Sequence, residues 1–168
     1  MSQLSLSIES SLLVRDVAGE YRPANADEVL QAAQRLLGTQ LRGREVLTSP
    51  QAVRDFLRVK LGALEHEVFA VLMLDAQNRL IEYVELFRGT VSQASVYPRE
   101  VVKESLAFNA AAPSFCHNHP SGVAEPSRAD ETLTSTLKPA LSLVDVRVLD
   151  HLIVAGNDVM SFAERGLL

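Results

Sequence analysis

The sequence predicts an α/β protein with a mixed sheet flanked by helices, and three observations support this fold class. Residues 68–74 are all apolar, with the length and composition of a strand buried on both faces. Apolar residues at helical spacing stand both before and after this run. Helical and strand-like segments then alternate to the end of the chain, as they do where helices cover a sheet.

Length and composition are those of a soluble globular chain. The 168 residues fit one domain at 48–168 preceded by a partly helical extension at 1–47. The net charge of −5 argues against nucleic-acid binding by the whole surface. One cysteine excludes an internal disulfide and favours a reducing, cytoplasmic setting. No basic signal-peptide region and no apolar run of bilayer length is present, so no membrane association is expected.

Two helices are expected before the buried run. The first spans residues 27–37 and ends at Gly38, ahead of a basic Arg-Gly-Arg loop. The second has Ser49 as its N-cap and Pro50 at its first position, and Gly62 ends it. The apolar residues at helical spacing in this second helix are Val53, Phe56, Leu57 and Leu61.

Strands and helices follow in alternation. Residues 67–74 and 80–87 are predicted to form two strands joined by a turn at 75–78, and therefore a hairpin. Pro98 opens a helix, and a short strand at 114–117 comes after it. The remaining predicted elements are a helix at 130–143 and strands at 144–149, 152–155 and 159–162.

The most informative segment is the hexapeptide His-Asn-His-Pro-Ser-Gly at 117–122, with Ser127 and Asp130 downstream. Alternate residues of a strand point to the same face, so His117 and His119 present two imidazoles together. The following loop is long enough to bring back the Asp130 carboxylate. These are the three protein ligands of a catalytic zinc site, which keeps a fourth position for water. A structural zinc site normally has a fourth protein ligand, most often cysteine, and the chain has one cysteine.

Each part of this pattern also has a purely structural explanation. A lone His-x-His pair is a weak metal signal, and Asn-His-Pro-Ser-Gly is good turn chemistry. Ser127 followed by Asp130 also suits a helix N-cap with an acidic residue at its third position. The Ser127 hydroxyl is then either a cap or a donor to an oxyanion that forms on a substrate. In combination and in this order, the residues favour a metal centre.

Glu67 is the candidate general base. It stands at the start of the most apolar run in the chain, where a carboxylate has no packing role. Partial burial raises the pKa of a carboxyl group, which suits it to proton transfer. Two alternatives stay open: Glu67 is a solvated residue ahead of a strand, or Glu65 takes the role.

Three neighbouring residues are assigned supporting positions. Alternation places Cys116 and Asn118 on the strand face opposite to the ligands. Cys116 is expected to be a small core residue, and Asn118 is expected to fix the backbone of a loop. His151 lies between an aspartate and an apolar strand, so we expect a hydrogen-bonded interior histidine that supports the site without binding the metal.

These residues together resemble the JAMM/MPN metalloprotease domain, and the hexapeptide is similar to that of its RadC-like branch. The resemblance covers approximately residues 48–168 and implies the JAMM/MPN (cytidine-deaminase-like) architecture. It includes the hairpin around Glu67, Phe-Arg-Gly-Thr-Val at 87–91, Tyr-Pro-Arg-Glu-Val-Val at 97–102, Ser-Arg-Ala-Asp at 127–130, and the segments 144–154 and 161–168.

The resemblance also implies roles for the matching residues. A zinc ion is held by His117, His119 and Asp130. Glu67 activates the water that attacks the substrate, and Ser127 helps to stabilise the tetrahedral intermediate. Better-known members of the JAMM family hydrolyse peptide or isopeptide bonds, so the resemblance implies a protein or peptide substrate.

The extension departs from the RadC-like pattern. Residues 1–47 lack the Gly-Ile-Gly type of helix-hairpin-helix string, so the chain is similar to the short RadC-like proteins of mobile elements, and direct nucleic-acid binding is not expected. The alternative to a hydrolase is a non-catalytic metal-binding interaction module in a DNA-repair or mobile-element complex. Metal-dependent attack on phosphodiesters is a third hypothesis, which the acidic net charge disfavours. The sequence leaves open the bond that is cleaved and the oligomeric state.

Overall fold

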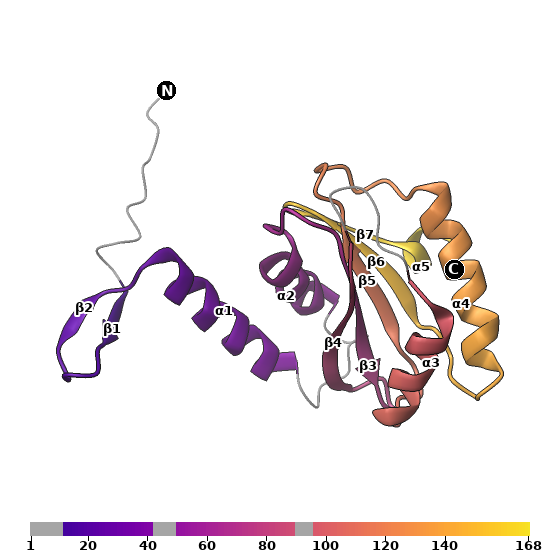
Figure 1. Ribbon diagram of the computed structural model, residues 1–168, viewed down its shortest axis with the longest axis horizontal. Helices are drawn as coiled ribbons and strands as arrows, with labels where there is room; N and C mark the ends of the chain where they lie inside the picture. Colours follow the sequence, from indigo (N-terminus) through magenta and orange to yellow (C-terminus); the bar gives the residue numbers. More distant parts are fainter. Residues whose placement is uncertain (1–11, 42–49, 90–95) are drawn as a thin grey trace.

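A five-stranded mixed sheet with helices on both faces forms the centre of the protein, in a computed structural model that describes residues 12–41, 50–89 and 96–168 (Figure 1). The strand order is β4-β3-β5-β6-β7. The strands are β3 (Val68–Leu74), β4 (Leu80–Arg88), β5 (Ser114–Asn118), β6 (Asp150–Ala155) and β7 (Asp158–Ser161). The helices are α1 (Ala26–Leu41), α2 (Pro50–Leu61), α3 (Pro98–Ala107), α4 (Arg128–Ser142) and α5 (Phe162–Arg165).

The sheet is mixed because β5 and β6 run parallel, whereas its other neighbouring strands are antiparallel. The parallel pair is joined by a crossover that contains α4, which lies with α3 on one face of the sheet (Figure 1). Helix α2 lies on the other face. The predicted fold class, a mixed sheet flanked by helices, is confirmed.

The central strand β3 is buried along its whole length, and its side chains alternate between two apolar cores. Ala70 and Leu72 pack in the core that contains Leu57 of α2. Phe69 and Val71 pack in the core on the α3 and α4 side. Burial on both faces explains why β3 is a continuous apolar run without alternation in the sequence.

The same alternation in β5 decides where its polar residues point. His117 is paired with Phe69 in the antiparallel register between β3 and β5, so its side chain lies on the α4 face. Cys116 and Asn118 point to the α2 face. Cys116 is fully buried in the apolar core that contains Leu57 of α2, called the α2 core below. The positions predicted for these two residues agree with this arrangement.

The hairpin β3–β4 and the helices α2 and α3 agree closely with the predicted elements. The β3–β4 turn is closed by a hydrogen bond from Asp75 N–H to the Arg79 carbonyl, and Asn78 has a φ of 57°. Asparagine is one of the few residues other than glycine that adopts this left-handed conformation readily. Helix α2 begins at Pro50, as predicted, whereas its proposed cap Ser49 and the basic loop at 42–44 lie outside the described residues.

Gly38 does not end the first helix, which was the prediction. Helix α1 continues to Leu41. A glycine in a helix interior is unfavourable but tolerated when it packs closely. The ring of Phe56 in α2 lies 3.6 Å from where a Cβ of Gly38 would be. The glycine therefore lies at the contact between α1 and α2 rather than at a helix terminus.

The strand predicted at 144–149 is also wrong. These residues form a turn and an extended segment that follows α4, with Asp145 at a φ of 59°. Val146 and Val148 are buried in the core on the α4 side, which produced the strand-like alternation. The segment makes two backbone hydrogen bonds to residues 111–113, from Arg147 and Leu149, but no continuous ladder.

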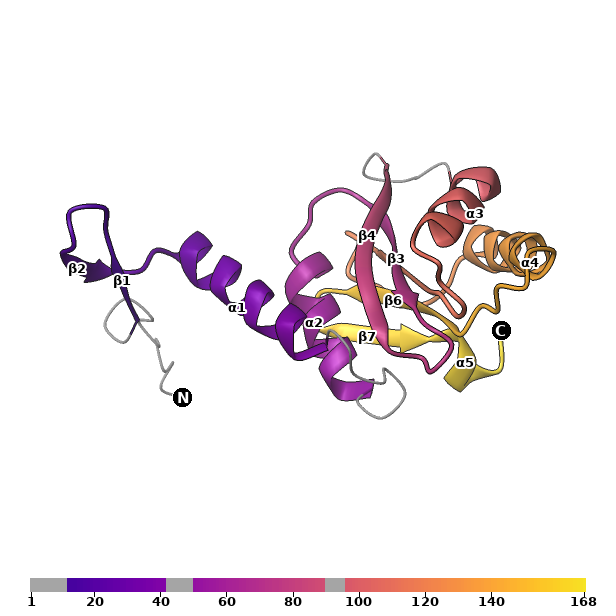
Figure 2. The same cartoon turned by 90° about the horizontal axis from the view of Figure 1, so that it is seen from below.

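The two ends of the described chain hold further differences from the prediction. A small antiparallel sheet of β1 (Leu13–Arg15) and β2 (Tyr21–Pro23), which was not predicted, lies at the far end of α1 from the main sheet (Figure 2). At the other end, Phe162 starts α5 instead of ending β7. Among the described helices, none has the length and apolar character needed to cross a bilayer.

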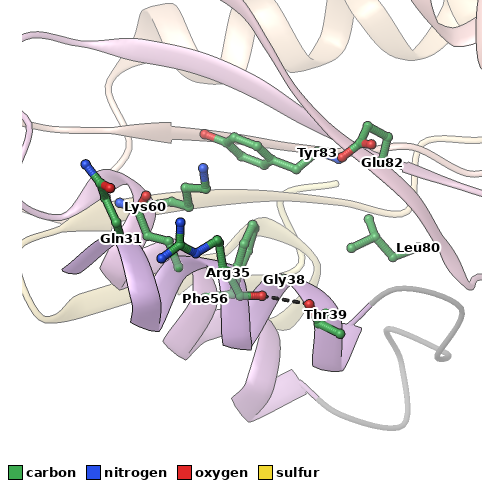
Figure 3. A pocket seen from close by; sticks show the side chains of 10 residues that line it. Gln31, Arg35, Gly38, Thr39, Phe56, Lys60, Leu80, Glu82 and Tyr83 are labelled. Atoms are coloured by element: carbon green, nitrogen blue, oxygen red, sulfur yellow. Dashed lines mark hydrogen bonds between the residues drawn. The ribbon is translucent and has the colours of Figure 1, made fainter. Parts of the chain in front are cut away.

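A cavity of about 480 Å³ lies between α1, α2 and the edge strand β4 (Figure 3). Arg35 and Lys60 line it together with Phe56 and Tyr83. Phe56 and Tyr83 also pack against the α2 core, so this cavity belongs to the α2 side of the sheet. It is separated by the sheet from the side on which His117 points.

Candidate metal centre

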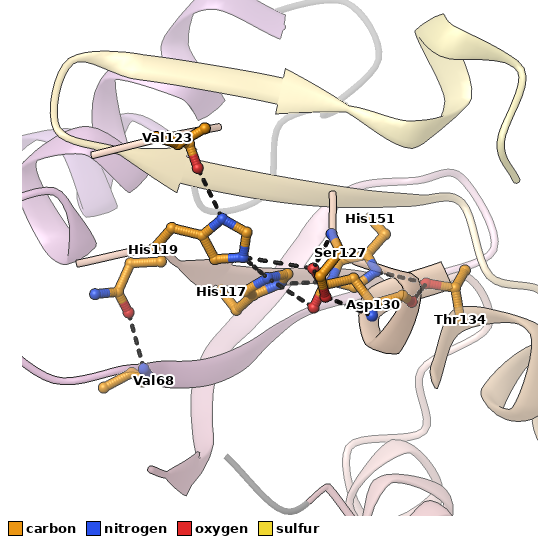
Figure 4. A network of polar contacts seen from close by, with 9 residues as sticks. Val68, His117, His119, Val123, Ser127, Asp130, Thr134 and His151 are labelled. Carbon is orange, nitrogen blue, oxygen red and sulfur yellow. Dashed lines mark hydrogen bonds and ion pairs between the residues drawn. The ribbon is translucent and has the colours of Figure 1, made fainter. Parts of the chain in front are cut away.

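Three side chains converge where β5 ends and α4 begins (Figure 4). His117 comes from β5, His119 from the loop after it, and Asp130 from the first turn of α4. The Nε2 atoms of His117 and His119 are 2.9 Å apart. The Asp130 carboxylate oxygens lie 3.3 Å from His117 Nε2 and 3.5 Å from His119 Nε2. The structure thus brings together the three residues predicted as ligands, with one ligand atom of each within 4.8 Å of the others.

The loop from β5 to α4 is held in place at several points. His119 N–H donates to the Val154 carbonyl at 2.8 Å, which extends the pairing with β6 beyond the strand end. Gly122 N–H donates to the His119 carbonyl, and Gly122 has a φ of 79°, a conformation that favours glycine. An ion pair between Glu125 and Arg165 ties the far part of the loop to α5. The turn chemistry read from the sequence therefore serves to bring Asp130 back to the histidines.

The outer nitrogens of both imidazoles are hydrogen-bonded. His119 Nδ1 lies 2.8 Å from the Val123 carbonyl oxygen, which can only accept, so Nδ1 carries the proton. In a neutral His119 ring, Nε2 is then the bare nitrogen that faces the centre. His117 Nδ1 lies 2.8 Å from Nε2 of His151 and also leaves its own Nε2 facing the centre.

The donor set fits a metal ion. Two unprotonated ring nitrogens at 2.9 Å would repel each other unless a cation lay between them. Imidazole and carboxylate ligands suit zinc, and they also accept iron, cobalt or nickel. Within the described part of the chain this group has three members, which leaves room for a water or a substrate. The His119 side chain is 17% exposed, so solvent reaches the group from that side.

The charges of these groups depend on one another. Burial opposes ionisation of Asp130, yet hydrogen bonds with the imidazoles of His117 and His119 hold the pKa of its carboxyl well below the usual range. The same contact with Asp130 raises the pKa of His119, against the effect of burial. Positive charge is therefore favoured between the three groups, and in the absence of a metal it is carried by a proton. A metal ion has to displace that proton, so metal affinity falls as the pH falls.

Ser127 and Asp130 form a capping box at the start of α4, one of the two explanations left open by the sequence. The Ser127 side chain accepts from Asp130 N–H at 3.2 Å. Asp130 Oδ2 in turn accepts from the Ser127 N–H and from its hydroxyl, both at 2.7 Å. The cap also orients the carboxylate, because these bonds engage Oδ2 and leave Oδ1 directed at His117. The structural and the ligand explanations of Asp130 are thus compatible.

Glu67 directly precedes β3, and its side chain is half-buried. Its carbonyl accepts a hydrogen bond from Gly89 N–H at 2.8 Å. Burial raises the pKa of the Glu67 carboxyl, while the imidazoles of His117 and His119 oppose the rise. The Glu67 carboxyl and the two imidazoles therefore interact electrostatically. Glu65, the alternative base, is exposed.

Two residues near the site bear out the supporting positions expected for them. Asn118 Oδ1 accepts from Val68 N–H at 2.8 Å, and Nδ2 donates to the His66 carbonyl at 3.0 Å. Asn118 therefore fixes backbone and does not belong to the metal group, as predicted, but the backbone it fixes is the segment ahead of β3. His151 is fully buried and contacts His117, and burial lowers its pKa far below the ordinary range, so the ring is neutral.

Thr134 was missed in the sequence. It is buried on the inner face of α4 and contacts His151. A signal was present: Thr134 lies four residues after Asp130 and one turn before Leu137, so a polar side chain stands within the buried stripe of the helix. The Val123 carbonyl was also missed, and no sequence pattern indicates it because any residue supplies a carbonyl.

Comparisons with known proteins agree with this arrangement. A family model described as the RadC-like JAB domain matches residues 47–167. A UPF0758 protein of Leptothrix cholodnii is 63% identical over 150 residues, which cover 89% of this chain and 68% of that protein. A UPF0758 protein of Methylibium petroleiphilum is 59% identical over 167 residues, covering 95% of this chain and 75% of that protein. A UPF0758 protein of Aromatoleum aromaticum is 62% identical over 151 residues, which cover 89% of this chain and 67% of that protein.

The family match and these identities agree with the resemblance read from the hexapeptide. The match starts at residue 47, close to the predicted start of the domain, whereas the division into an extension and a domain stays a prediction. The chain belongs to the family of RadC-like JAB domain proteins.

Proposed function

We propose that the protein is a metal-dependent hydrolase of the JAMM type that cleaves a peptide or isopeptide bond in a protein or peptide substrate. One observation carries the proposal: ligand atoms of His117, His119 and Asp130, from three different segments, lie within 4.8 Å of one another. Zinc is the proposed metal. When bound, it supplies a Lewis acid that polarises the substrate carbonyl and makes water a stronger nucleophile near neutral pH.

Glu67 is proposed as the general base. Its carboxyl interacts electrostatically with the candidate ligands, and its raised pKa favours both accepting a proton from water and passing it to the leaving amine. A fully solvated carboxylate holds a proton less readily at the working pH. The half-buried position at the start of β3 therefore supports the assignment of Glu67 over the exposed Glu65.

Ser127 is proposed to donate a hydrogen bond to the oxyanion of the tetrahedral intermediate. Its hydroxyl donates to Asp130 Oδ2 in the present structure, so this role requires the hydroxyl to turn toward the substrate. The Ser127 N–H also donates to Oδ2, which leaves the carboxylate oriented after the hydroxyl has turned. The exposed position of Ser127 gives a substrate access to it.

The test begins with the metal content of protein purified without chelator or histidine tag. The proposal expects about one zinc per chain, lost in His117→Ala and retained in His66→Ala, an exchange outside the ligand group. The zinc-loaded protein is then screened against peptide and isopeptide-linked substrates, with a chelator-treated sample as the control. Stoichiometric zinc without hydrolysis of any such substrate would contradict the hydrolase proposal but not the metal site.

A non-catalytic interaction module is the second candidate, in a DNA-repair or mobile-element complex. One observation favours it: Leu13 and Tyr21 of the β1–β2 sheet and Val17 of the turn between these strands have exposed hydrophobic side chains, and this sheet lies far from β5 and α4. Exposed apolar groups in one place are typical of a contact surface. Under this hypothesis Asp130→Ala abolishes metal binding and leaves a co-purifying partner bound, whereas Val17→Ser and Tyr21→Ser release it.

A further inference from the structure

A chain of hydrogen bonds links the two candidate ligands His117 and Asp130 through the interior of the protein (Figure 4). His117 Nδ1 lies 2.8 Å from His151 Nε2. On the other side of that ring, His151 Nδ1 lies 2.7 Å from the Thr134 hydroxyl. The same hydroxyl oxygen lies 2.7 Å from the backbone carbonyl of Asp130. Both His151 and Thr134 are buried, so water does not compete for these contacts.

The direction of the chain is fixed at its carbonyl end. A carbonyl oxygen has no proton, and two oxygens at 2.7 Å need one between them, so the Thr134 hydroxyl donates to Asp130 O. Its only proton is then used. The contact with His151 must be one in which Nδ1 carries the proton and donates to the hydroxyl oxygen.

The rest of the polarity follows from the neutral state of the buried ring. His151 packs against Phe69, Phe115 and Phe162, and such apolar surroundings disfavour a charged imidazole. A neutral ring protonated on Nδ1 has a bare Nε2, which can only accept. His117 Nδ1 must therefore donate, and in a neutral His117 ring Nε2 is then the nitrogen without a proton.

We propose that His151 and Thr134 are positioning residues that hold His117 in the tautomer able to bind a metal through Nε2. This inference rests on the proposed metal site, and it extends it by two residues outside the ligand set. Because the Asp130 carbonyl can only accept, the Thr134 hydroxyl donates to it and accepts from His151 Nδ1. His151 Nε2 is then an acceptor, and His117 Nδ1 must donate to it. The two ligands are thus coupled: the backbone of one decides the protonation of the other.

The position of His151 is itself fixed, by a hydrogen bond to Asp150 and by the pairing of β6 with β5. The backbone N–H of His151 donates to Asp150 Oδ1 at 2.7 Å. Asp150 Oδ2 in turn accepts from the Ser161 hydroxyl at 2.6 Å. Strand β6 also runs parallel to β5, with His151 paired to Phe115, two residues before His117 on the same face. The imidazole of His151 is therefore held beside that of His117 by the sheet, with little freedom to follow a misoriented ligand.

The first test measures the tautomers directly in the wild-type protein, without metal and at a pH near 8.5. Two-bond ¹H–¹⁵N correlations distinguish Nδ1–H from Nε2–H rings, and single substitutions assign the four histidines. The proposal expects His151 and His117 both to carry the proton on Nδ1. A His151 ring protonated on Nε2 would overturn it, because His117 would then be forced to accept.

The second test removes the hydroxyl that sets the polarity. Thr134→Val keeps the side-chain shape and leaves His151 Nδ1 without an acceptor. The His151 ring then favours the Nε2–H tautomer. His117 has to accept from it at Nδ1 and therefore carries its own proton on Nε2, the nitrogen that would bind the metal. We expect zinc affinity, measured by competition with a chelating dye, to fall 10- to 100-fold. Thr134→Ser restores the hydroxyl and should restore the affinity.

Thr132→Val is the matched control. Thr132 is exposed on the same helix and makes the same type of bond, from its hydroxyl to the Arg128 carbonyl four residues earlier at 2.8 Å. In the described part of the chain, the hydrogen bonds of Thr132 involve Arg128, Ser135 and Thr136 and no histidine. The zinc affinity of the Thr132→Val variant should stay within about twofold of that of the wild-type protein. Equal affinities of folded Thr134→Val and Thr132→Val would contradict the proposal.

Two substitutions of His151 separate positioning from simple packing. His151→Leu fills the site but offers no acceptor to His117, whereas the amide oxygen of His151→Gln can accept near the former Nε2. The Gln variant should retain the tighter zinc binding of the two. The reverse order would indicate that His151 acts only through packing.

The tests also distinguish failure of this inference from failure of the proposed function. A wild-type protein that binds no zinc refutes the metal site. The tautomers measured without metal still decide the polarity of the chain from Asp130 to His117.

Discussion

The Asn118 side chain accepts a hydrogen bond from Val68 N–H at 2.8 Å, across the face of the sheet opposite to the candidate ligands. Its amide nitrogen donates to the His66 carbonyl at 3.0 Å. One side chain therefore holds the backbone on both sides of Glu67. Because Asn118 also lies between His117 and His119 in the sequence, it fixes the proposed base relative to the proposed ligands.

Replacing Asn118 should separate catalysis from metal binding. In Asn118→Ala the buried Val68 N–H loses its partner, so we expect the free energy of unfolding to fall by about 1–3 kcal/mol. Hydrolysis should fall further than zinc affinity, because Glu67 is loosened while the ligands stay in place. Denaturant unfolding and zinc titration measure the two effects. Asn157→Ala, in the exposed β6–β7 turn, is the control and should change neither.

Glu67→Gln should keep the metal and lose the activity. Glutamine has nearly the shape of glutamate but cannot take a proton from water, so hydrolysis should fall by about 10²- to 10⁴-fold. Zinc content should stay at the wild-type level, since Glu67 lies outside the ligand group. Glu65→Gln changes an exposed neighbour and should retain activity. If Glu65→Gln is the inactive variant instead, the base has been assigned to the wrong residue.

The acid side of the pH–rate profile should reflect the raised pKa of Glu67. The carboxyl must be ionised to act as a base, and burial, opposed by the nearby imidazoles, raises its pKa above the ordinary 4.5. The rate per bound zinc is therefore expected to rise with pH through a midpoint above 4.5 and to fall steadily as the pH drops below that midpoint. Zinc occupancy has to be measured at each pH, because protons also displace the metal. A rate per bound zinc that does not change across this range would exclude Glu67 as the base.

Two glycines should respond to alanine in opposite directions. A Cβ on Gly62 would lie 2.6 Å from the carbonyl oxygens of both Arg58 and Gly156, and backbone atoms cannot move away easily. We expect Gly62→Ala to lower the free energy of unfolding by about 1–3 kcal/mol. Gly38→Ala, where the nearest neighbour is a Phe56 ring atom at 3.6 Å, should stabilise α1 by about 0.5–1 kcal/mol. Thermal and denaturant unfolding of both variants check the pair.

The sequence predicted most of the sheet because its signals are local. The apolar run of β3, the turn with Asp75 and Asn78, and the proline that opens α3 each act within a few residues. The errors arose where distant contacts decide. Gly38 continues a helix because Phe56 packs against it, and Val146 and Val148 alternate like a strand because they enter the core.

The candidate site follows the same division. The hexapeptide and Asp130 were recognisable because ligand types and spacing are written in one short segment. Thr134 was not, since its partner His151 is supplied by another strand and only the fold brings them together. The capping box of Ser127 and Asp130 shows a second limit of sequence-based prediction. The same two residues cap α4 and orient the carboxylate that faces the histidines, so their spacing alone does not separate the two roles.

The parallel pairing of β5 and β6 has a consequence for how the protein would acquire the proposed metal. β6 can join β5 only after the crossover through α4 has closed, and this crossover carries Asp130. The unfolded chain offers no more than a flexible His-x-His pair. Tight binding therefore belongs to the folded chain alone, and metal at 100 times its dissociation constant adds about 2.7 kcal/mol to folding stability. Zinc occupancy would then report how much of the protein in a cell has completed folding.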